Sequence, residues 1–205
     1  MNTYVYVDGF NFYYRVVKGT KYKWLDLSAL CRFLLRQHRI LKIKYFTAHV
    51  SARPNDPGIP ARQQLYVRAL RTVPNLEIIL GQFVQHPVQL PVVGTNPVRF
   101  ATVLRTDEKG SDVNLASALL VDCYRSDCDI AVVVSNDSDL AFPMEHVKRH
   151  LGKIIGVVNP HKRPSRDLLA LANFFKSIRR SALAESQFPI KLTDGSGEFH
   201  KPPTW

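Results

Sequence analysis

The 205-residue sequence lacks the features that mark several classes of protein. It has only three cysteines, Cys31, Cys123 and Cys128, which form neither an even set nor a CxxC pair, so we expect no disulfide framework and no zinc site. No apolar run approaches the ~18–20 residues that cross a bilayer. Residues 1–8 contain no basic region followed by an apolar stretch, so we expect no secretory signal. These absences predict a cytoplasmic protein with reduced thiols and no membrane segment.

Motifs of nucleotide-cofactor enzymes are also missing. There is no Walker loop and no GxGxxG sequence.

His146 and His150 have the i, i+4 spacing of zinc ligands on a helix, but no Glu lies between them as it does in metalloproteases. We interpret this pair as part of the basic face of a surface helix.

Charge is abundant and uneven. The net charge is +11, which favours a polyanionic partner. Residues 111–147 reverse the sign, with seven Asp or Glu and one Lys or Arg. This acidic island is either a solvated face or a carboxylate cluster that holds cations between surfaces that hold phosphates.

The hydrophobic pattern alternates between strands and helices. This alternation predicts a parallel sheet of an α/β protein, covered by helices on both faces. We expect one domain over residues 1–180, with an inserted β-hairpin near 83–106 and an extended tail over 181–205. The expected strands are 3–8, 40–50, 76–80, 129–135 and 153–158, and the expected helices are 10–18, 27–37, 61–72, 112–124, 140–150 and 165–180.

Several carboxylates fall where this fold would bring them together. Asp8 ends the first strand, and Asp137 and Asp139 follow the apolar strand that ends at Ser135. Ligands of open parallel sheets bind beyond the carboxyl ends of the strands. Asp112 opens the helix before that strand, so its place is less constrained. Converging carboxylates repel each other, and a hard divalent cation such as Mg²⁺ relieves that repulsion and can promote phosphodiester cleavage.

Each of these residues also has a purely structural interpretation. Asp8, Asp137 and Asp139 are common helix-capping residues, and Asp112 suits the first turn of a helix. Asn11 either orients a ligand or water or caps the backbone. Ser135 either binds phosphate or water or satisfies loop amides. The conjunction of all these residues is more specific than any one of them.

Three separated motifs resemble one known family. VYVDGFNFYYR (5–15), EKGSDVNLA (108–116) and VVSNDSDLAFPM (133–144) are similar to motifs of NYN domains of the LabA-like kind, within the PIN-like nuclease superfamily. The resemblance spans roughly residues 3–180. It implies a PIN-like three-layer α/β/α fold with a five-stranded parallel sheet in the order 3-2-1-4-5. It also implies a Mg²⁺- or Mn²⁺-dependent ribonuclease.

The same resemblance assigns roles to individual residues. Asp8, Asp112 and Asp137 stand in the positions of the metal-binding acids of the family. Asn11 matches the first motif, and Ser135 and Asp139 match the motif after the fourth strand. We therefore expect a catalytic set of Asp8, Asp112, Asp137, Asp139, Asn11 and Ser135. Glu108 and Lys109 match the segment that leads into Asp112.

Basic residues supply candidate contacts to nucleic acid. Lys162, Arg163 and Arg166 follow the fifth expected strand and would hold a phosphate backbone near the crevice, unless they form a solvated loop. Lys21 and Lys23 alternate with Tyr22 and Trp24, a mixture that suits single-stranded nucleic acid unless the rings belong to the core. Lys109 completes the set.

The sequence thus predicts a ribonuclease acting on RNA, with DNA as the alternative substrate. A nucleic-acid-binding regulator of the same fold with little or no turnover is the second hypothesis. A third is the toxin of a toxin–antitoxin pair, whose crevice a partner covers. The sequence leaves open whether the chain forms a homodimer or binds a regulatory protein.

Overall fold

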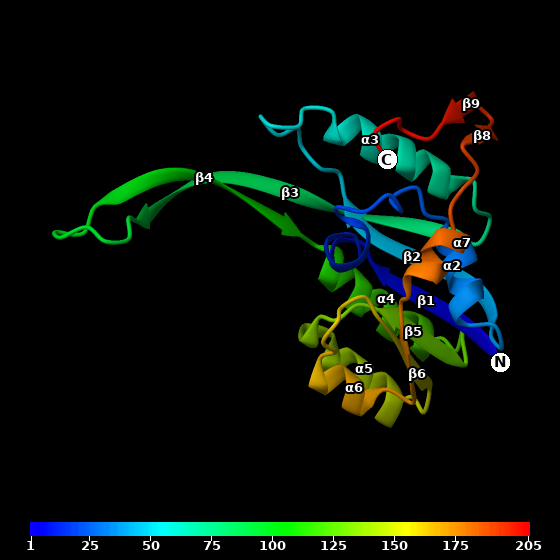
Figure 1. The fold of residues 1–205 in the computed structure, drawn as a ribbon. Coiled ribbons are helices and arrows are strands. Elements are labelled where there is room, and N and C mark those ends of the chain that lie inside the picture. The colour runs from blue at the N-terminus through cyan, green and yellow to red at the C-terminus, as the bar shows by residue number, and fades with distance from the viewer.

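The computed structural model describes residues 1–205 and is built on one large sheet and one small sheet (Figure 1). The large sheet has seven strands in the order β4-β3-β2-β1-β5-β6-β7, and the small sheet pairs β8 with β9. The strands are β1 (Asn2–Asp8), β2 (Arg39–Ala48), β3 (Leu76–Pro91), β4 (Phe100–Lys109), β5 (Ile130–Val134), β6 (Ile154–Asn159), β7 (Phe174–Ser177), β8 (Lys191–Asp194) and β9 (Gly197–His200).

Helices cover both faces of the large sheet. The first face carries α1, η1, α2, α3 and α7, and the second carries α4, α5 and α6. The helical segments are α1 (Gly9–Phe12), η1 (Tyr13–Val17), α2 (Leu27–Leu34), α3 (Ile59–Arg71), α4 (Ser111–Tyr124), η2 (Ser138–Leu140), α5 (Ala141–Arg149), α6 (Arg166–Leu171) and α7 (Arg180–Glu185).

The predicted α/β class and the predicted order of the parallel strands are confirmed. The five expected strands correspond to β1, β2, β3, β5 and β6, and they lie in the order β3-β2-β1-β5-β6. The number of strands was wrong, because the sheet has seven. β7 adds a further parallel strand beside β6, and β4 pairs antiparallel with β3.

The two cores explain why β5 is apolar throughout. In β5, Val132 and Val134 pack into the core on the first face, and Ala131 and Val133 pack into the core on the second. Successive side chains of a strand point to opposite faces, so a strand covered on both sides must be apolar throughout. The polar residues that function needs are therefore confined to the ends of such strands.

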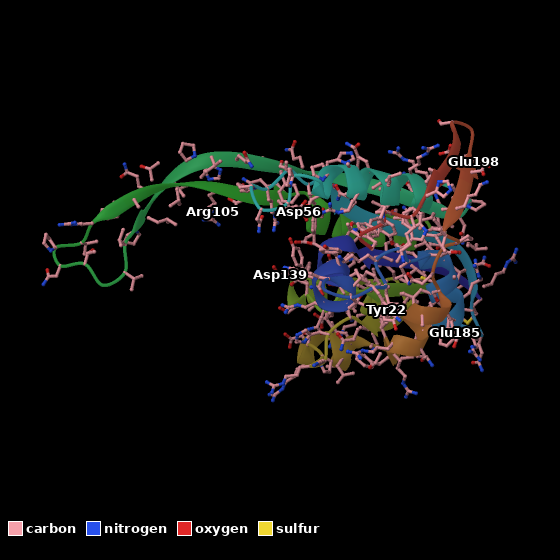
Figure 2. All side chains as sticks on the ribbon, turned by 45° about the horizontal axis from the view of Figure 1, so that its top comes forward. Tyr22, Asp56, Arg105, Asp139, Glu185 and Glu198 are labelled. Atoms are coloured by element: carbon pink, nitrogen blue, oxygen red, sulfur yellow. The ribbon has the colours of Figure 1, made fainter.

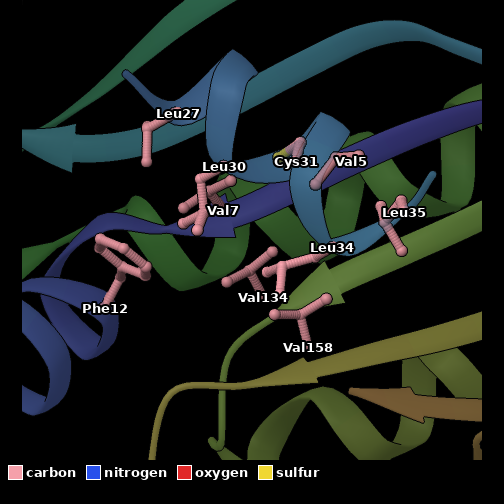
Figure 3. Close-up of a pocket in the computed structure, with 10 residues that line it drawn as sticks. All are labelled: Val5, Val7, Phe12, Leu27, Leu30, Cys31, Leu34, Leu35, Val134 and Val158. Atoms are coloured by element: carbon pink, nitrogen blue, oxygen red, sulfur yellow. The ribbon is translucent and has the colours of Figure 1, made fainter. Parts of the chain in front are cut away.

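A small cavity on the first face belongs to this core. Figure 3 shows it between α2 and the strands, with Val7, Leu30 and Val134 among its lining side chains. All ten lining residues are hydrophobic. A cavity without polar partners does not hold ordered water, so we interpret it as a packing gap and not as a ligand site.

The inserted hairpin is longer than expected and begins earlier. β3 does not stop at Gly81 but runs through it, with 16 residues in all. A Cβ atom at Gly81 would lie 2.5 Å from Glu108 Oε1 and 2.7 Å from the Lys109 carbonyl oxygen. Glycine therefore stands there because the end of β4 approaches the backbone closely, and not because the strand ends.

Beyond Gly81 the hairpin leaves the body as an arm, defined here as residues 82–109 (Figure 1). The parallel pairing of β3 with β2 ends at Gly81, and from Gln82 onward β3 pairs only with β4. Figure 2 shows Arg105 out on this arm, away from the helices. Val93 at the tip is 98% exposed, and Leu104 is 67% exposed.

Shortening the arm is expected to leave the fold almost as stable as before. Replacing residues 86–105 with Asn-Gly joins Gln85 to Thr106, which already face each other in the hairpin. Because the removed side chains are largely exposed, the free energy of unfolding should change by less than about 1 kcal/mol. Urea denaturation measures the change, and a loss above about 3 kcal/mol would show that the arm is part of the core.

The expected helix over 165–180 was wrong in its second half. α6 ends at Leu171, and Phe174–Ser177 form β7. Phe174 packs into the first core and Phe175 into the second, which is the two-sided burial of a strand. Phe174 fits against Gly156 of β6, where a Cβ atom would collide with its ring. The apolar spacing was compatible with a helix, but this tertiary fit requires a strand.

Residues 181–205, expected to form an extended tail, are folded onto the first face. They include most of α7 and the hairpin of β8 and β9. The indole Nε1–H of Trp24 donates to the Pro189 carbonyl oxygen at 2.8 Å. Arg68 of α3 forms a two-pronged ion pair with Asp194, with both N···O distances at 2.7 Å. No helix of the structure has the length and apolar character needed to cross a membrane.

Candidate metal-binding site

Asp8 lies at the carboxyl end of β1 and begins α1. Its Oδ1 accepts the Asn11 backbone N–H at 2.9 Å, so it caps the helix as one interpretation of the sequence expected. Its Oδ2 accepts the Ser135 hydroxyl at 2.8 Å. A Cβ atom at the next residue, Gly9, would lie 2.5 Å from the Phe46 carbonyl oxygen, so α1 starts in direct contact with β2.

Ser135 connects Asp8 to the loop after β5. β1 and β5 are neighbouring parallel strands, with Val7 opposite Val134, so their next residues meet at one edge of the sheet. The Ser135 Oγ atom accepts the Asp137 backbone N–H at 3.1 Å while its hydroxyl donates to Asp8. The buried serine therefore fixes the spacing between the two acids.

Asp112 reaches the same edge from α4. Gly110, at φ +100° in the left-handed region that favours glycine, turns the chain from β4 into this helix. Glu108 Oε1 accepts both the backbone N–H and the hydroxyl of Ser111. This local network fixes the first turn of α4, in which Asp112 stands.

The three carboxylates form one cluster. One oxygen each from Asp8, Asp112 and Asp137 can be chosen so that all three lie within 4.8 Å of one another. Asp8 is buried, Asp137 is half-buried and Asp112 is exposed. The sequence prediction that these three distant acids converge is therefore confirmed in geometry.

The electrostatics of the cluster follow from its crowding. Burial raises the pKa of Asp8, against the hydrogen bonds from Asn11 and Ser135 that lower it. Asp112 is exposed as a residue, but partial desolvation of its carboxyl group, followed by the nearby charges of Asp8 and Asp137, raises its pKa to about 6. The carboxylates at this edge of the sheet repel one another and have no positive partner. A bound divalent cation would relieve this repulsion.

A neighbouring unpartnered oxygen supports the fit to a cation. The Asn11 Oδ1 atom is buried and accepts no hydrogen bond. Buried polar atoms nearly always have a partner, so an orphaned oxygen on a residue that lines the same cleft as the three carboxylates requires an explanation. Oxygen donors of this kind are those that Mg²⁺, with its retained water molecules, uses in proteins.

Asp139 takes a different place from the other acids. It is exposed in η2, and its backbone N–H donates to Asp137 Oδ1 at 3.0 Å. It stands outside the cluster of three but contributes to the raised pKa of Asp112. Its geometry places it beside the candidate metal ligands.

An open cleft of about 780 Å³ surrounds the cluster. Its walls include residues that sequence reasoning missed, namely Arg15, Arg53 and the base of the arm at Phe83 and Leu104. Arg15 ends the first quoted motif, and this position is the one signal that could have drawn attention to it. Arg53 and the arm reach the cleft through tertiary structure that no local pattern encodes.

None of the predicted nucleic-acid contacts lies in the walls of the cleft. Asn136 holds the loop after β6 near the site by donating to the Arg163 carbonyl oxygen and accepting the Ser165 N–H. This brings the backbone of the loop that carries Lys162 and Arg163 beside the acids. The cleft lining includes none of Lys21, Lys23, Lys109, Lys162, Arg163 and Arg166.

Neutralising Asp112 is expected to stabilise the metal-free protein. Its folded pKa of about 6 lies above the ordinary value of 3.8, so the folded state holds its proton more tightly. The contribution of Asp112 to the free energy of unfolding therefore falls as pH rises from about 4 to 6. Above pH 6 the carboxyl group is ionised in both states, and the full loss of stability is present. In EDTA at pH 7.5, Asp112→Asn should raise the free energy of unfolding by about 1 kcal/mol, a figure discounted for solvent screening.

Thermal denaturation in EDTA across this pH range measures that effect. The gain should shrink toward pH 4, where wild-type Asp112 is itself largely protonated. An Asp112→Asn protein that is less stable than wild type at pH 7.5 would show that the favourable negative charge of Asp112 in the first turn of α4 outweighs the repulsion.

Comparisons with known proteins identify a family, a relative in sequence and a similar fold. The family described as NYN domain matches residues 2–179. The 6-hydroxy-3-succinoylpyridine 3-monooxygenase HspA of Pseudomonas putida (strain DSM 28022 / S16) is 32% identical over 238 aligned residues, which cover 100% of this chain and 75% of that protein. A protein of unknown function from Vibrio parahaemolyticus RIMD 2210633 shares the fold, with a TM-score of 0.59 and 18% identity over 91% of this chain and 96% of that one.

Proposed function

The chain belongs to the NYN domain family, and on that premise we propose that it is a metal-dependent ribonuclease hydrolysing phosphodiester bonds of single-stranded RNA. The observation that carries the proposal is the cluster of Asp8, Asp112 and Asp137, with carboxylate oxygens within 4.8 Å of one another. The family is nuclease-like. Asp8 ends β1, Asp137 follows β5, and Asp112 reaches the same edge from the first turn of α4, where this class of sheet binds ligands.

Asp8, Asp112 and Asp137 would hold Mg²⁺ or Mn²⁺ through one carboxylate oxygen each. When bound, such an ion supplies Lewis-acid stabilisation of phosphoryl oxygens and lowers the pKa of an attacking water. Ser135 and the Asn11 N–H keep the Asp8 carboxylate oriented. The free Asn11 Oδ1 atom can accept a hydrogen bond from water. Asp139, outside the three, adds negative charge that strengthens cation binding.

The walls of the cleft suit an unpaired strand. Arg15 and Arg53 offer positive charge for the phosphate backbone, and Arg53 has no carboxylate partner within 4 Å. Phe10 and Phe83 meet edge to face with ring centroids 5.6 Å apart and offer aromatic surface for a base. Bases bind aromatic rings by stacking on them, and only a single strand can present unstacked bases; those of a duplex are already stacked. Lys21, Lys23, Lys109, Lys162, Arg163 and Arg166 would extend the positive surface.

The test is cleavage of end-labelled single-stranded RNA by the wild-type and Asp137→Asn proteins in Mn²⁺, Mg²⁺ or EDTA. The proposal predicts cleavage that requires a divalent ion and disappears with the substitution. RNA binding without cleavage by either protein would instead favour the regulator of the same fold. Parallel reactions with duplex RNA and single-stranded DNA define the substrate class, and expression with and without Asp8→Asn tests for a toxin.

A second candidate function comes from the Pseudomonas relative, whose name describes a monooxygenase acting on a hydroxypyridine. A monooxygenase transfers one atom of O₂ to its substrate and reduces the other to water, so it consumes two electrons from a reductant. An oxygen electrode with a hydroxypyridine and a reductant distinguishes it from the nuclease. Substrate-dependent oxygen uptake without RNA cleavage would replace our first proposal.

A further inference from the structure

A second cavity of about 430 Å³ adjoins the acidic cleft but is a separate space. It lies between α1 and η1 on one side and the start of α3 on the other, with the end of β2 at its base. It shares Phe10, Tyr14, Val50 and Arg53 with the lining of the cleft, and it includes none of the three clustered acids. We call it the tyrosine pocket. Its volume is that of an ordinary small-ligand site.

Aromatic rings line the tyrosine pocket from several elements. Tyr13 and Tyr14 of η1 meet at right angles with centroids 5.3 Å apart. Tyr66 of α3 and Trp205 meet with centroids 5.9 Å apart and an interplanar angle of 62°. Tyr45 rises from β2. Rings brought together in this way favour a planar aromatic guest, which can stack on one and meet another edge-on.

The charge of the pocket is positive and mostly uncompensated. Four cations line it, Lys18, Lys23, Arg53 and Arg62, against one acid, Asp56. Asp56 is already paired with Arg62. The other three cations have no carboxylate within 4 Å. An anionic group on a guest would supply the missing partner.

The cations are placed against the aromatic walls. Lys18 Nζ lies 4.7 Å from the centre of the Tyr14 ring, and Lys23 Nζ lies 6.0 Å from the centre of the Trp205 ring. Arg53 donates a hydrogen bond to the Tyr14 hydroxyl at 3.3 Å. Burial raises the pKa of the Tyr13, Tyr45 and Tyr66 hydroxyls, so these phenols stay neutral and add no negative charge.

We propose that the tyrosine pocket is a binding site for a planar aromatic ring that carries an anionic group. Two sources share this chemistry. One is a nucleotide of an RNA strand, whose base would enter the pocket while the next phosphate lies across Phe10 and Arg53 toward the acids. The other is a free heteroaromatic carboxylate. The site stands on its own lining and does not require that the acids catalyse hydrolysis.

Calorimetric titration in EDTA and low salt tests the site without any turnover. The probes are AMP and UMP for the nucleotide, pyridine-3-carboxylate for the small acid, and adenosine and inorganic phosphate for the ring or the anion alone. We expect one saturable site per chain for AMP and UMP or for pyridine-3-carboxylate, with adenosine and phosphate at least about tenfold weaker. Which ring-bearing anion binds identifies the source.

Variants locate the binding in the pocket. Lys18→Gln with Lys23→Gln should weaken binding roughly five- to tenfold, and Tyr13→Leu should weaken it several-fold. Arg71→Gln is the matched control, because Arg71 at the end of α3 is exposed and lines neither the tyrosine pocket nor the acidic cleft. Its affinity for the same probe should stay within about twofold of wild type. The bound ring should also quench fluorescence from Trp205, and this change should vanish in Trp205→Phe.

Three results would overturn the inference. One is that none of the ring-bearing anions binds. Another is that the affinity is lost with Arg15→Gln and kept in the pocket variants, which would place the ligand in the acidic cleft. The third is that inorganic phosphate binds as tightly as AMP. That result would show that the pocket binds an anion and that its aromatic rings contribute nothing to the affinity. Circular dichroism of each variant verifies its fold, and the proposed ribonuclease activity is assayed separately.

Discussion

A protein carrying Asp8→Asn is expected to cleave RNA at least about 1,000-fold more slowly than wild type while keeping its fold. Asp8 is only 4% exposed and is fixed by two hydrogen bonds, so the amide occupies the same place without the charge. Under the proposed function, the substitution removes one of the three proposed cation ligands and part of the negative charge that attracts the ion. Initial rates with end-labelled RNA in saturating Mn²⁺ measure the effect.

Asp139→Asn is the matched comparison for this prediction. Asp139 carries the same charge at the same edge of the sheet but lies outside the cluster. Its substitution should slow cleavage by roughly tenfold or less, with the main change in the concentration of metal required. Equal losses from the two substitutions would mean that general negative charge, and not ligand geometry, supports the reaction.

Trp24→Ala is expected to lower the free energy of unfolding by about 3–5 kcal/mol. Trp24 is fully buried, and its ring meets Phe188, Phe199 and Trp205 with centroids 5.9 to 6.4 Å away. The Trp24 indole also donates to the Pro189 carbonyl oxygen. The substitution therefore leaves a cavity and an unpaired acceptor where the C-terminal segment joins the body. Urea denaturation followed by circular dichroism measures the loss.

Tyr124→Ala serves as the control, because Tyr124 is 78% exposed at the end of α4. It should change the free energy of unfolding by less than about 0.5 kcal/mol. A Trp24→Ala protein as stable as this control would mean that residues 186–205 contribute little to the stability of the fold. That result would fit the extended tail that was expected from the sequence.

Local pattern was enough to place five of the six parallel strands, and their order was expected only from the resemblance to NYN domains. The apolar run of β5 and the alternation of β2 carry their own signals, and the motifs fix the order by resemblance. β7 and the C-terminal segment could not be found in this way. Phe174 and Phe175 form a strand because they pack into opposite cores. Phe199 is buried through tertiary contacts, among them the Trp24 ring and the Arg68 guanidinium.

Some residues of the candidate site could be predicted from the sequence, and others could not. Asp8, Asp112 and Asp137 were predicted to meet because strand ends and a helix start share one edge of the sheet. Arg53 lies in a proline-rich loop, and nothing around it in the sequence indicates that it faces the cleft. The six basic residues proposed to bind nucleic acid remain a prediction, because solvent-exposed charge is placed by the partner as much as by the fold.

The most direct measurement is anomalous diffraction from crystals soaked in Mn²⁺. The account predicts an anomalous peak about 2.0–2.3 Å from carboxylate oxygens of Asp8, Asp112 and Asp137 in the wild-type protein and its absence in Asp8→Asn. A Mn²⁺ ion bound elsewhere, with the three carboxylates free, would contradict the assignment of these acids as the metal site on which the ribonuclease proposal depends.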